Sequence, residues 1–507
     1  MSVPSAPERR PRLVDGARTG VDAAALVAVL VALRVVLWAL DPRVAVYGGR
    51  GWHFLDTAVL EQDFLGSLVL LHAQPPLLNF VGGLGLLVSH QWFPPVTRVV
   101  WSVLGLGIAL GAYSIVRSVG AGRAAAWACG LLVGAHPGLL LAERAFFYEV
   151  PAGAAFTAIV ASLLIATRTG GLRWLFVASL AASVLALTKS LFLPAFALAV
   201  TVLAAGLRRV QVRTLRARDL VVLALPLALP LAWVAKNAVM FGSASTSTWV
   251  GINVFGPARA FVPDSVLAGL EARGVISRFW RTSTRTGHTF SYIDDYPIPF
   301  LRPARAHPAV AAAVKSTGDP NFNYEGYIAV SRALFREAIA IVRAYPSGLL
   351  RSARTNVAVM AQGSDAYPWP FEPPLDGPIV PWQRAFDSVV YGKWLSAWVG
   401  RTWPGVAGGR PQEKSPVVLL AVPAVLLGLA ALAVRKRGTP QSLAAGGVLV
   451  MLLYTLGLMC VGNLGETDRM LLTVEPTVVA FAVAGAGALL GRLGAVARRP
   501  PVGRSTG

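Results

Sequence analysis

The sequence has few charged residues and almost no cysteine. Charged residues make up 14% of the 507 residues, whereas hydrophobic residues make up 55%. Soluble globular chains carry about 25% charged residues, so this composition indicates a polytopic membrane protein. The two cysteines, Cys129 and Cys460, both fall in apolar runs, which excludes a disulfide framework as the basis of the fold.

Acidic residues are scarcer than basic ones, with 25 Asp and Glu against 46 Lys and Arg. In a soluble chain the resulting net charge of +21 would suit a nucleic-acid partner. In a membrane protein, basic residues first mark the loops that stay in the cytoplasm. We therefore expect the lipid bilayer as a partner and no nucleic acid.

Several apolar runs are long enough, or nearly long enough, to cross a bilayer about 30 Å thick. The first of these runs follows a polar segment over 1–22. No small-residue cleavage site is obvious after the run, so we predict an uncleaved signal anchor. We predict about ten transmembrane helices, at 23–40, 96–116, 124–141, 152–167, 174–188, 190–206, 219–235, 415–434, 443–462 and 470–490.

These spans divide the chain into five parts and predict an all-α membrane protein with helices lying on its outer face. The central region is polar, rich in Pro and Trp, and too long for a simple connection, so we predict an outer domain or a set of surface helices there. The parts are a cytoplasmic tail over 1–22, a transmembrane module over 23–235 with a first outer loop over 41–95, an extracytoplasmic domain over 236–414, C-terminal transmembrane helices over 415–490, and a cytoplasmic tail over 491–507.

One apolar stretch is left out of this count because residues 71–79, "LHAQPPLLN", interrupt it with polar residues and two prolines. The run from Pro75 to Val88 would extend only about 21 Å as a helix, which is too short to cross. Proline is tolerated in the first turn of a helix. We therefore predict an interfacial or half-inserted helix here.

The distribution of basic residues supports this interpretation. With both termini in the cytoplasm and residues 71–89 outside the count, the cytoplasmic segments hold 20 basic residues against four acidic ones. Counting 71–89 as a span would turn these basic loops outward, against the positive-inside rule. We expect a multi-pass plasma-membrane protein with its chemistry on the outer face.

The first outer loop contains two aspartates that could act in catalysis. Asp56 has apolar neighbours, and Asp63 follows seven residues later, on the same face if the segment is helical. A partly buried carboxylate at a membrane surface suits a general base, because burial favours its protonated form. The alternative is an amphipathic surface helix with a solvated acidic face.

Other outer segments add a second carboxylate and several cations. Glu143 follows an apolar run, with Tyr148 close behind. Lys189, Lys236 and Arg469 lie at the outer ends of predicted spans, where a lipid phosphate would explain them. Side chains that reach from the helix end toward the headgroups would explain each one equally well.

Together, these features resemble the GT-C superfamily of membrane glycosyltransferases that use polyprenyl-phosphate sugars, such as protein O-mannosyltransferases and lipid A aminoarabinose transferases. The resemblance rests on "LD" at 55–56, on "HAQPPLLN" about 20 residues later, on an acidic residue after the third span and on the late "GETDR" segment. It covers residues 20 to about 240 and 462–476, and much of 250–414 has no recognisable counterpart.

The resemblance implies a transfer with inversion from a polyprenyl-phosphate sugar to a glycan, lipid or protein of the cell envelope, and a composition rich in Ala, Val, Arg and Gly is typical of a bacterium with a high-GC genome. It also implies the site residues. They are Asp56 as catalytic base; Glu143 and Asp63 as candidates for a second carboxylate or metal ligand; Lys189, Lys236 and Arg469 at the donor phosphate; and His72, Gln74, Tyr148 and Glu466 near the substrate.

At two positions this chain differs from the GT-C pattern, and these differences leave the question of a metal cofactor open. Many relatives have an Asp-Glu pair where this chain has Asp56-Thr57, and some have an acidic pair where it has Glu143-Arg144. The sequence therefore identifies no cofactor, and a divalent metal such as Mg²⁺ or Mn²⁺ stays open.

Three other classes of protein stay open as well. One is an oligosaccharide ligase or polymerase, for which Arg281, Arg285 and His288 in "RFWRTSTRTGHTF" are the candidates. Another is a transporter of lipid-linked sugars, although the predicted spans hold very few ionisable residues, such as Arg34. The last is a purely structural membrane protein.

Overall fold

The computed structural model describes residues 13–41, 54–89, 93–212, 214–282, 305–364, 379–395, 415–435, 437–462 and 467–497. These residues are mainly helical, and the only β pairing among them is an isolated bridge between Val314 and Pro320. This confirms the all-α fold class.

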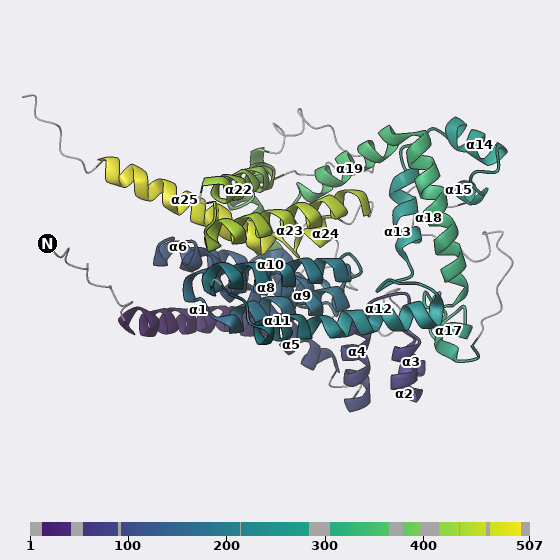
Figure 1. The fold of residues 1–507 in the computed structure, drawn as a ribbon, viewed down its shortest axis with the longest axis horizontal. Coiled ribbons are helices and arrows are strands. Elements are labelled where there is room, and N and C mark those ends of the chain that lie inside the picture. The colour runs from purple at the N-terminus through teal and green to yellow at the C-terminus, as the bar shows by residue number, and fades with distance from the viewer. Residues whose placement is uncertain are drawn as a thin grey trace, which may run out of the picture.

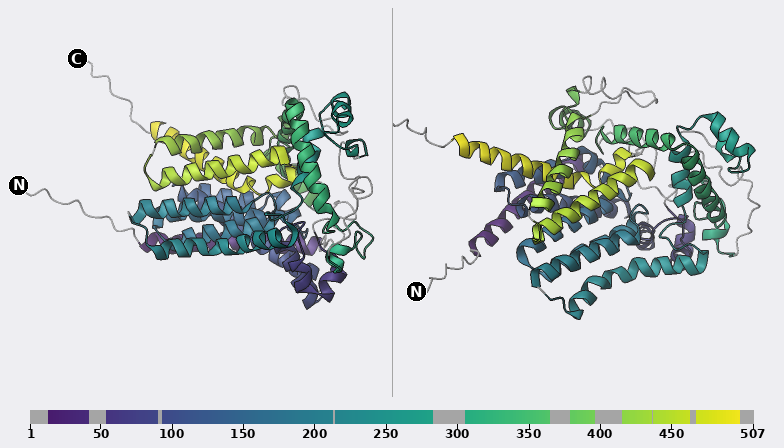
Figure 2. Two further views of the ribbon diagram at one scale, coloured as in Figure 1. Left: turned by 45° about the vertical axis from the view of Figure 1, so that its right-hand side comes forward. Right: turned by 45° about the horizontal axis from the view of Figure 1, so that its top comes forward.

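The long apolar helices lie side by side in one bundle (Figure 1). They are α1 (Leu13–Leu40), α5 (Phe93–Ser118), α6 (Arg123–Gly134), α8 (Glu149–Thr169), α9 (Leu172–Thr188), α10 (Pro194–Val212), α11 (Ala217–Ala224), η1 (Leu225–Leu227), α12 (Ala228–Phe241), α22 (Pro416–Arg435), α23 (Pro440–Gly462) and α25 (Glu475–Ala497). The first turn of α1 and the last turn of α25 lie at the same end of this bundle (Figures 1 and 2).

Shorter helices gather mostly at the opposite end of the bundle (Figure 2). They are α2 (Thr57–Gln62), α3 (Phe64–Val69), α4 (Leu77–Val88), α7 (Pro137–Ala142), α13 (Val250–Arg259), α14 (Asp264–Ala272), α15 (Phe279–Thr282), α17 (Pro308–Ala311), α18 (Gly326–Ala344), α19 (Pro346–Met360), α20 (Ile379–Val389), η3 (Lys393–Leu395) and α24 (Thr467–Leu471).

Seven of the predicted spans correspond to helices that are long and apolar enough to cross a bilayer. They are Gly20–Leu40, Phe93–Ser118, Glu149–Thr169, Pro194–Val212, Ala217–Phe241, Pro416–Arg435 and Pro440–Gly462. The spans predicted at 124–141, 174–188 and 470–490 correspond to shorter apolar helices, so the described residues do not confirm a count of ten.

Two of these three segments are interrupted. The segment 124–141 divides into α6 and α7 at Ala135 and His136, because Pro137 begins a new helix. The segment 470–490 divides into α24 and α25, with a non-helical stretch between them. A continuous apolar run therefore did not imply one continuous helix.

The predicted part boundaries also differ from the helix ends. Helix α1 begins at Leu13, inside the tail predicted over 1–22, and α25 continues to Ala497. Helix α12 continues past residue 235 and ends before Gly242, whose positive φ of 62° is the left-handed conformation that commonly ends a helix.

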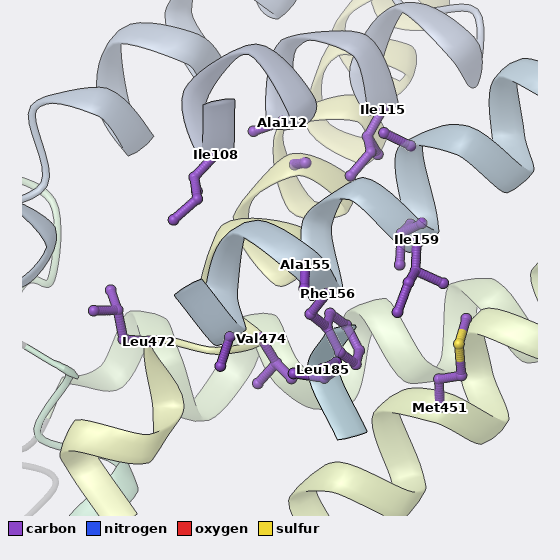
Figure 3. Packing of buried hydrophobic residues seen from close by; sticks show 14 of the residues in the cluster. Ile108, Ala112, Ile115, Ala155, Phe156, Ile159, Leu185, Met451, Leu472 and Val474 are labelled. Atoms are coloured by element: carbon purple, nitrogen blue, oxygen red, sulfur yellow. The ribbon is translucent and has the colours of Figure 1, made fainter. Parts of the chain in front are cut away.

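Two of the hydrophobic cores show how the molecule is divided. The bundle core surrounds α8, most of whose residues are buried. It includes Ile108, Phe156 and Ile159 (Figure 3). A second core, with Phe255, Leu334 and their neighbours, joins α13 to α18 outside the bundle. Part of the region 236–414 thus has a core of its own.

Helix α4 has the length predicted for the interrupted stretch. It contains 12 residues, which gives about 18 Å, and it begins directly after Pro76. One face is buried through Leu78 and Asn79, while Leu87 and Val88 on the other side are exposed. An apolar exposed face on a short helix suits a position within the surface of a bilayer.

Candidate active site at the outer loops

Asp56 lies at the start of α2, where its carboxylate accepts three hydrogen bonds. Oδ1 accepts from the N–H of Ala58 at 3.1 Å, as an aspartate at a helix N-cap commonly does. Ser316 donates twice, from its hydroxyl to Oδ1 at 2.6 Å and from its N–H to Oδ2 at 2.5 Å. Asp56 is buried. A carboxylate can accept about four hydrogen bonds, so Oδ2 keeps room for one more donor.

The turn that carries Ser316 is built from the outer domain. The bridge between Val314 and Pro320 closes it, and Gly318 has a φ of 86°, which favours glycine. Lys315 is buried in the same turn, and burial lowers its pKa to about 8, against the opposing effect of Asp319 and Asp56. Neither Lys315 nor Ser316 could be predicted from the sequence as a neighbour of Asp56, because 260 residues separate Ser316 from Asp56.

Asp63 has a different environment from Asp56. It ends α2 and begins α3, so the two aspartates cap separate short helices and do not share the face of one helix. Its side chain is 54% exposed, and its Oδ2 lies 3.2 Å from Nε2 of His307.

His72 is buried between two segments of the outer domain. Its Nδ1 lies 2.8 Å from Oγ1 of Thr248, and its Nε2 lies 2.9 Å from the carbonyl oxygen of Asn323. Burial lowers the pKa of His72 to about 3, so its ring is neutral at physiological pH. In this arrangement both ring nitrogens form hydrogen bonds with other residues of the protein. Gln74 nearby is half-buried.

Two of the three predicted phosphate-binding cations lie together. Glu149, at the start of α8, has its Oε1 3.4 Å from Nζ of Lys189 and 3.3 Å from Nε of Arg469. Arg469 also donates to the hydroxyl of Tyr148 at 2.9 Å, and Lys189 lies 4.7 Å from the centre of the Tyr148 ring. All four side chains are buried. Residues from α8, α9 and α24 thus form one charged cluster, hereafter the Lys189–Arg469 cluster.

Lys236, the third cation, lies elsewhere. Its Nζ donates to the carbonyl oxygen of Leu71 at 2.5 Å and sits 3.6 Å from the centre of the Trp233 ring. Lys236 therefore binds the backbone of Leu71, the residue directly before "HAQPPLLN".

Glu143 is bound by an arginine of the first span. Nε of Arg34 donates to Oε2 at 2.9 Å, and its Nη2 donates to Oε1 at 2.5 Å. Gly105 on α5 allows this close approach, because a Cβ there would lie 1.8 Å from Oε1 of Glu143. Glu143 and Asp56 thus have different partners among the described residues.

An apolar cavity of about 460 Å³ lies between α4, α5, α8 and α9. We call it the α4–α9 cavity. Its wall includes Leu78 from α4, Trp101 from α5 and Thr188 from α9. Thr188 precedes Lys189, and Nε1 of Trp101 donates to the carbonyl oxygen of Phe147 at 3.0 Å, beside Tyr148. The cavity therefore borders the Lys189–Arg469 cluster.

Helix α4 also connects this cavity to Asp56. Asn79 follows Leu78, and its Oδ1 accepts from the N–H of Leu55 at 2.7 Å. Phe54 stacks on Phe146 with 5.3 Å between ring centres, which joins the two outer loops. Asn79 is the last residue of "HAQPPLLN", and the sequence predicted no role for it.

No group of three His, Cys, Asp or Glu side chains that could hold a metal ion occurs among the residues that the structure describes. Asp56 is held by Ser316, and Glu143 is held by Arg34. This part of the chain therefore does not fit a metal centre by itself, and metal dependence stays an open prediction.

Some predicted residues lie outside the described part of the chain. They are Glu466, Arg285 and His288. Arg281, the remaining candidate of the ligase or polymerase alternative, lies within it, and its Nε donates to Oε2 of Glu271 at 2.8 Å.

The fold and the site define a polytopic helical membrane protein with a lipid-facing cavity that borders charged residues. No protein-family model matches the sequence, and no curated protein matches it.

Two solved structures are similar to the chain. One is the archaeal oligosaccharyltransferase AglB from Archaeoglobus fulgidus, in complex with an inhibitory peptide and a dolichol-phosphate, with 12% identity, a TM-score of 0.38, and coverage of 93% of this chain and 51% of that one. The other is ArnT from Cupriavidus metallidurans bound to undecaprenyl phosphate, with 19% identity, a TM-score of 0.31, and coverage of 87% and 78%. The chain spans about half the length of the archaeal protein.

Proposed function

We propose that this protein is a membrane glycosyltransferase that transfers a sugar from a polyprenyl-phosphate donor to a cell-envelope acceptor, with inversion at the anomeric carbon. The observation that carries this proposal is the α4–α9 cavity, an apolar space beside buried cations that α4 links to a buried aspartate. A lipid tail needs the apolar space, a phosphate needs the buried cations, and an acceptor hydroxyl needs the aspartate to take its proton.

The donor's tail would lie in the α4–α9 cavity. The wall of this cavity comes from helices that also face the bilayer, as the exposure of Val100 and Leu180 shows. A polyprenyl chain could therefore enter from the side without leaving an apolar environment, which costs little free energy.

The donor's phosphate would lie near Lys189 and Arg469. Glu149 and Tyr148 hold these two cations in fixed positions before any ligand arrives. Such a pre-arranged positive site stabilises the negative charge that develops on the departing phosphate.

Asp56 would act as the general base. Its Oδ2 would accept the proton of the acceptor hydroxyl, and the oxygen would form a bond with the anomeric carbon as the bond from that carbon to the phosphate oxygen breaks. The electron pair of the broken bond stays on the phosphate, which remains bound to the lipid. Ser316 would hold the carboxylate in position through its two hydrogen bonds.

The sidedness of the reaction is also part of the proposal. Helix α2, which Asp56 precedes, lies at the end of the bundle opposite to the first turn of α1 and the last turn of α25 (Figures 1 and 2). Since the basic loops favour cytoplasmic termini, we propose that the site faces the outside of the plasma membrane.

The direct test is donor consumption by the purified protein in detergent. A panel of radiolabelled polyprenyl-phosphate sugars would be supplied together with cell-envelope extract as the source of acceptor. We expect one donor to be consumed and its label to enter the acceptor fraction. If the protein uses none of these donors, the proposed function is wrong.

A further inference from the structure

A second cavity lies on the other side of α5, between α1, α5 and α7. It measures about 190 Å³ and we call it the α1–α5 cavity. Val35 on α1 and Val99 on α5 line it, and their side chains are exposed at the lipid-facing surface of the bundle. An apolar molecule within the membrane could therefore reach this cavity.

Five charged side chains line the α1–α5 cavity, and all of them are buried. They are Arg34, Asp41, Arg98, Glu143 and Arg144. Two ion pairs account for four of them. Arg34 pairs with Glu143, and Nη2 of Arg144 lies 2.7 Å from Oδ2 of Asp41.

Arg98 is the fifth, and it forms no ion pair with any residue in the described ranges. Its Nη1 donates to the backbone carbonyl oxygen of Asp41 at 2.8 Å, and its guanidinium lies 5.2 Å from the centre of the Trp38 ring. The two carboxylates near Arg98, Asp41 and Glu143, are each paired with another arginine. The cavity wall therefore carries three arginines against two carboxylates, and Arg98 is only 5% exposed.

A buried excess of positive charge is costly, most of all near lipid. Removing the charge by deprotonation is not open to arginine. The cost would fall if an anion entered the cavity, and phosphate matches the planar array of donors on a guanidinium. The apolar wall on the lipid side suits the chain that such a phosphate would carry.

We propose that the α1–α5 cavity binds the phosphate group of a membrane lipid, with Arg98 as its main partner and the lipid chain along Val35 and Val99. This site is separate from the α4–α9 cavity proposed for the donor. Two kinds of lipid offer this chemistry, a diacyl phospholipid and a polyprenyl phosphate.

Lipid binding to the purified, delipidated protein tests this proposal. Native mass spectrometry would follow titrations with phosphatidylglycerol and, separately, with undecaprenyl phosphate. Both titrations would use a Lys189→Gln background, which weakens the other proposed phosphate site. Arg98→Gln should weaken binding of one lipid about tenfold, as expected when a charge-assisted hydrogen bond is lost.

Two further variants make the result decisive. Arg273→Gln is the matched control, because Arg273 is exposed on the outer domain and its loss changes the net charge equally. Val99→Trp fills the lipid side of the cavity without changing charge, so it also tests the proposal if Arg98→Gln fails to fold.

The outcomes separate the two lipids. Weaker binding of phosphatidylglycerol to both cavity variants assigns a diacyl phospholipid, and weaker binding of undecaprenyl phosphate alone assigns a prenyl lipid. Affinities equal to those of the Arg273→Gln control for both lipids would overturn the proposal. Since no sugar is involved, this result is independent of whether the protein is a glycosyltransferase.

Discussion

The two cavities on either side of α5 differ in where their charges lie. The α4–α9 cavity has an almost wholly apolar wall, and its cations lie just beyond it in the Lys189–Arg469 cluster. The α1–α5 cavity is less than half as large and has five charged side chains in its own wall. The first arrangement suits a long apolar chain with its phosphate at the edge. The second suits a headgroup held inside the cavity.

The difference also separates the two candidate carboxylates. Asp56 is connected to the α4–α9 cavity through Asn79, whereas Glu143 lies in the wall of the α1–α5 cavity, neutralised by Arg34. If the chemistry belongs to the larger cavity, substitutions around Asp56 should affect turnover far more than substitutions around Arg98.

The largest expected effect is all-or-none and concerns the side of the membrane that the Asp56 loop faces. Ala244→Cys places an exposed thiol just after α12, four residues before Thr248, whose N–H donates to the carbonyl oxygen of His72. Ala124→Cys places an exposed thiol in the first turn of α6, next to Arg123, which pairs with Asp22 of α1. In intact cells, an impermeant thiol reagent should label the first and not the second. The reverse pattern would place the Asp56 loop on the cytoplasmic side of the membrane.

Asp56→Asn should have the largest effect on rate. The amide keeps the size of the side chain but accepts no proton, and loss of a general base costs about 10²- to 10⁴-fold. Turnover of the polyprenyl-phosphate sugar measures this effect. Asp63→Asn is the control and should retain most activity, because Asp63 is largely exposed. Normal turnover of Asp56→Asn would mean that the base is misassigned.

Lys189→Gln should weaken donor binding about 10- to 100-fold, since a charge-assisted hydrogen bond to phosphate contributes about 1.5–3 kcal/mol. Titration with undecaprenyl phosphate measures the affinity. Lys236→Gln provides a comparison, because Lys236 lies against Leu71 and Trp233 instead. Equal affinities for wild type and Lys189→Gln would leave the Lys189–Arg469 cluster with a purely structural role.

Ser316→Ala should lower turnover by about 3- to 10-fold. The variant loses the hydroxyl donor to Oδ1 of Asp56 but keeps the backbone donor to Oδ2, so about 1 kcal/mol of positioning is removed. Thr317→Ala, one residue along the turn, should be nearly unchanged, because its hydroxyl donates to Asp319 instead. If both variants lose turnover equally, the turn acts through its fold and not through Ser316.

The last expected effect is on the pH dependence of stability and leaves turnover aside. The pKa of Lys315 is lowered to about 8, so between pH 8 and about 10.4 the unfolded chain binds more protons than the folded one. Lys315 should therefore make stability rise with pH across this window. Thermal unfolding of wild type and Lys315→Met in detergent tests this. Parallel curves for the two proteins would contradict it.

Much of the bundle followed from local patterns. Seven of the ten predicted apolar runs became helices long enough to cross a bilayer, because in lipid every backbone polar group must find its partner within the helix. The two prolines of "HAQPPLLN" and the short apolar run after them predicted the short helix α4. Patterns of this kind depend on neighbouring residues, so no tertiary information was needed.

The breaks between α6 and α7 and between α24 and α25 were not predicted. Pro137 could have signalled the first, since proline favours a helix start, but the apolar residues around it hid the signal. The separate capping roles of Asp56 and Asp63 were missed for a similar reason, because their spacing also fits one continuous helix face.

By itself, the sequence indicated that the protein is helical and membrane-embedded, which loop segments carry its few carboxylates, and that Lys189, Lys236 and Arg469 lie where a positive charge needs a partner. The tertiary structure alone decided which of these groups meet. It placed Lys189 and Arg469 on Glu149, Glu143 on Arg34, and Ser316 on Asp56. The physical reason is that helix formation depends on residues a few positions apart, whereas a buried charge is satisfied by whichever partner the packed helices bring to it, however distant in the chain.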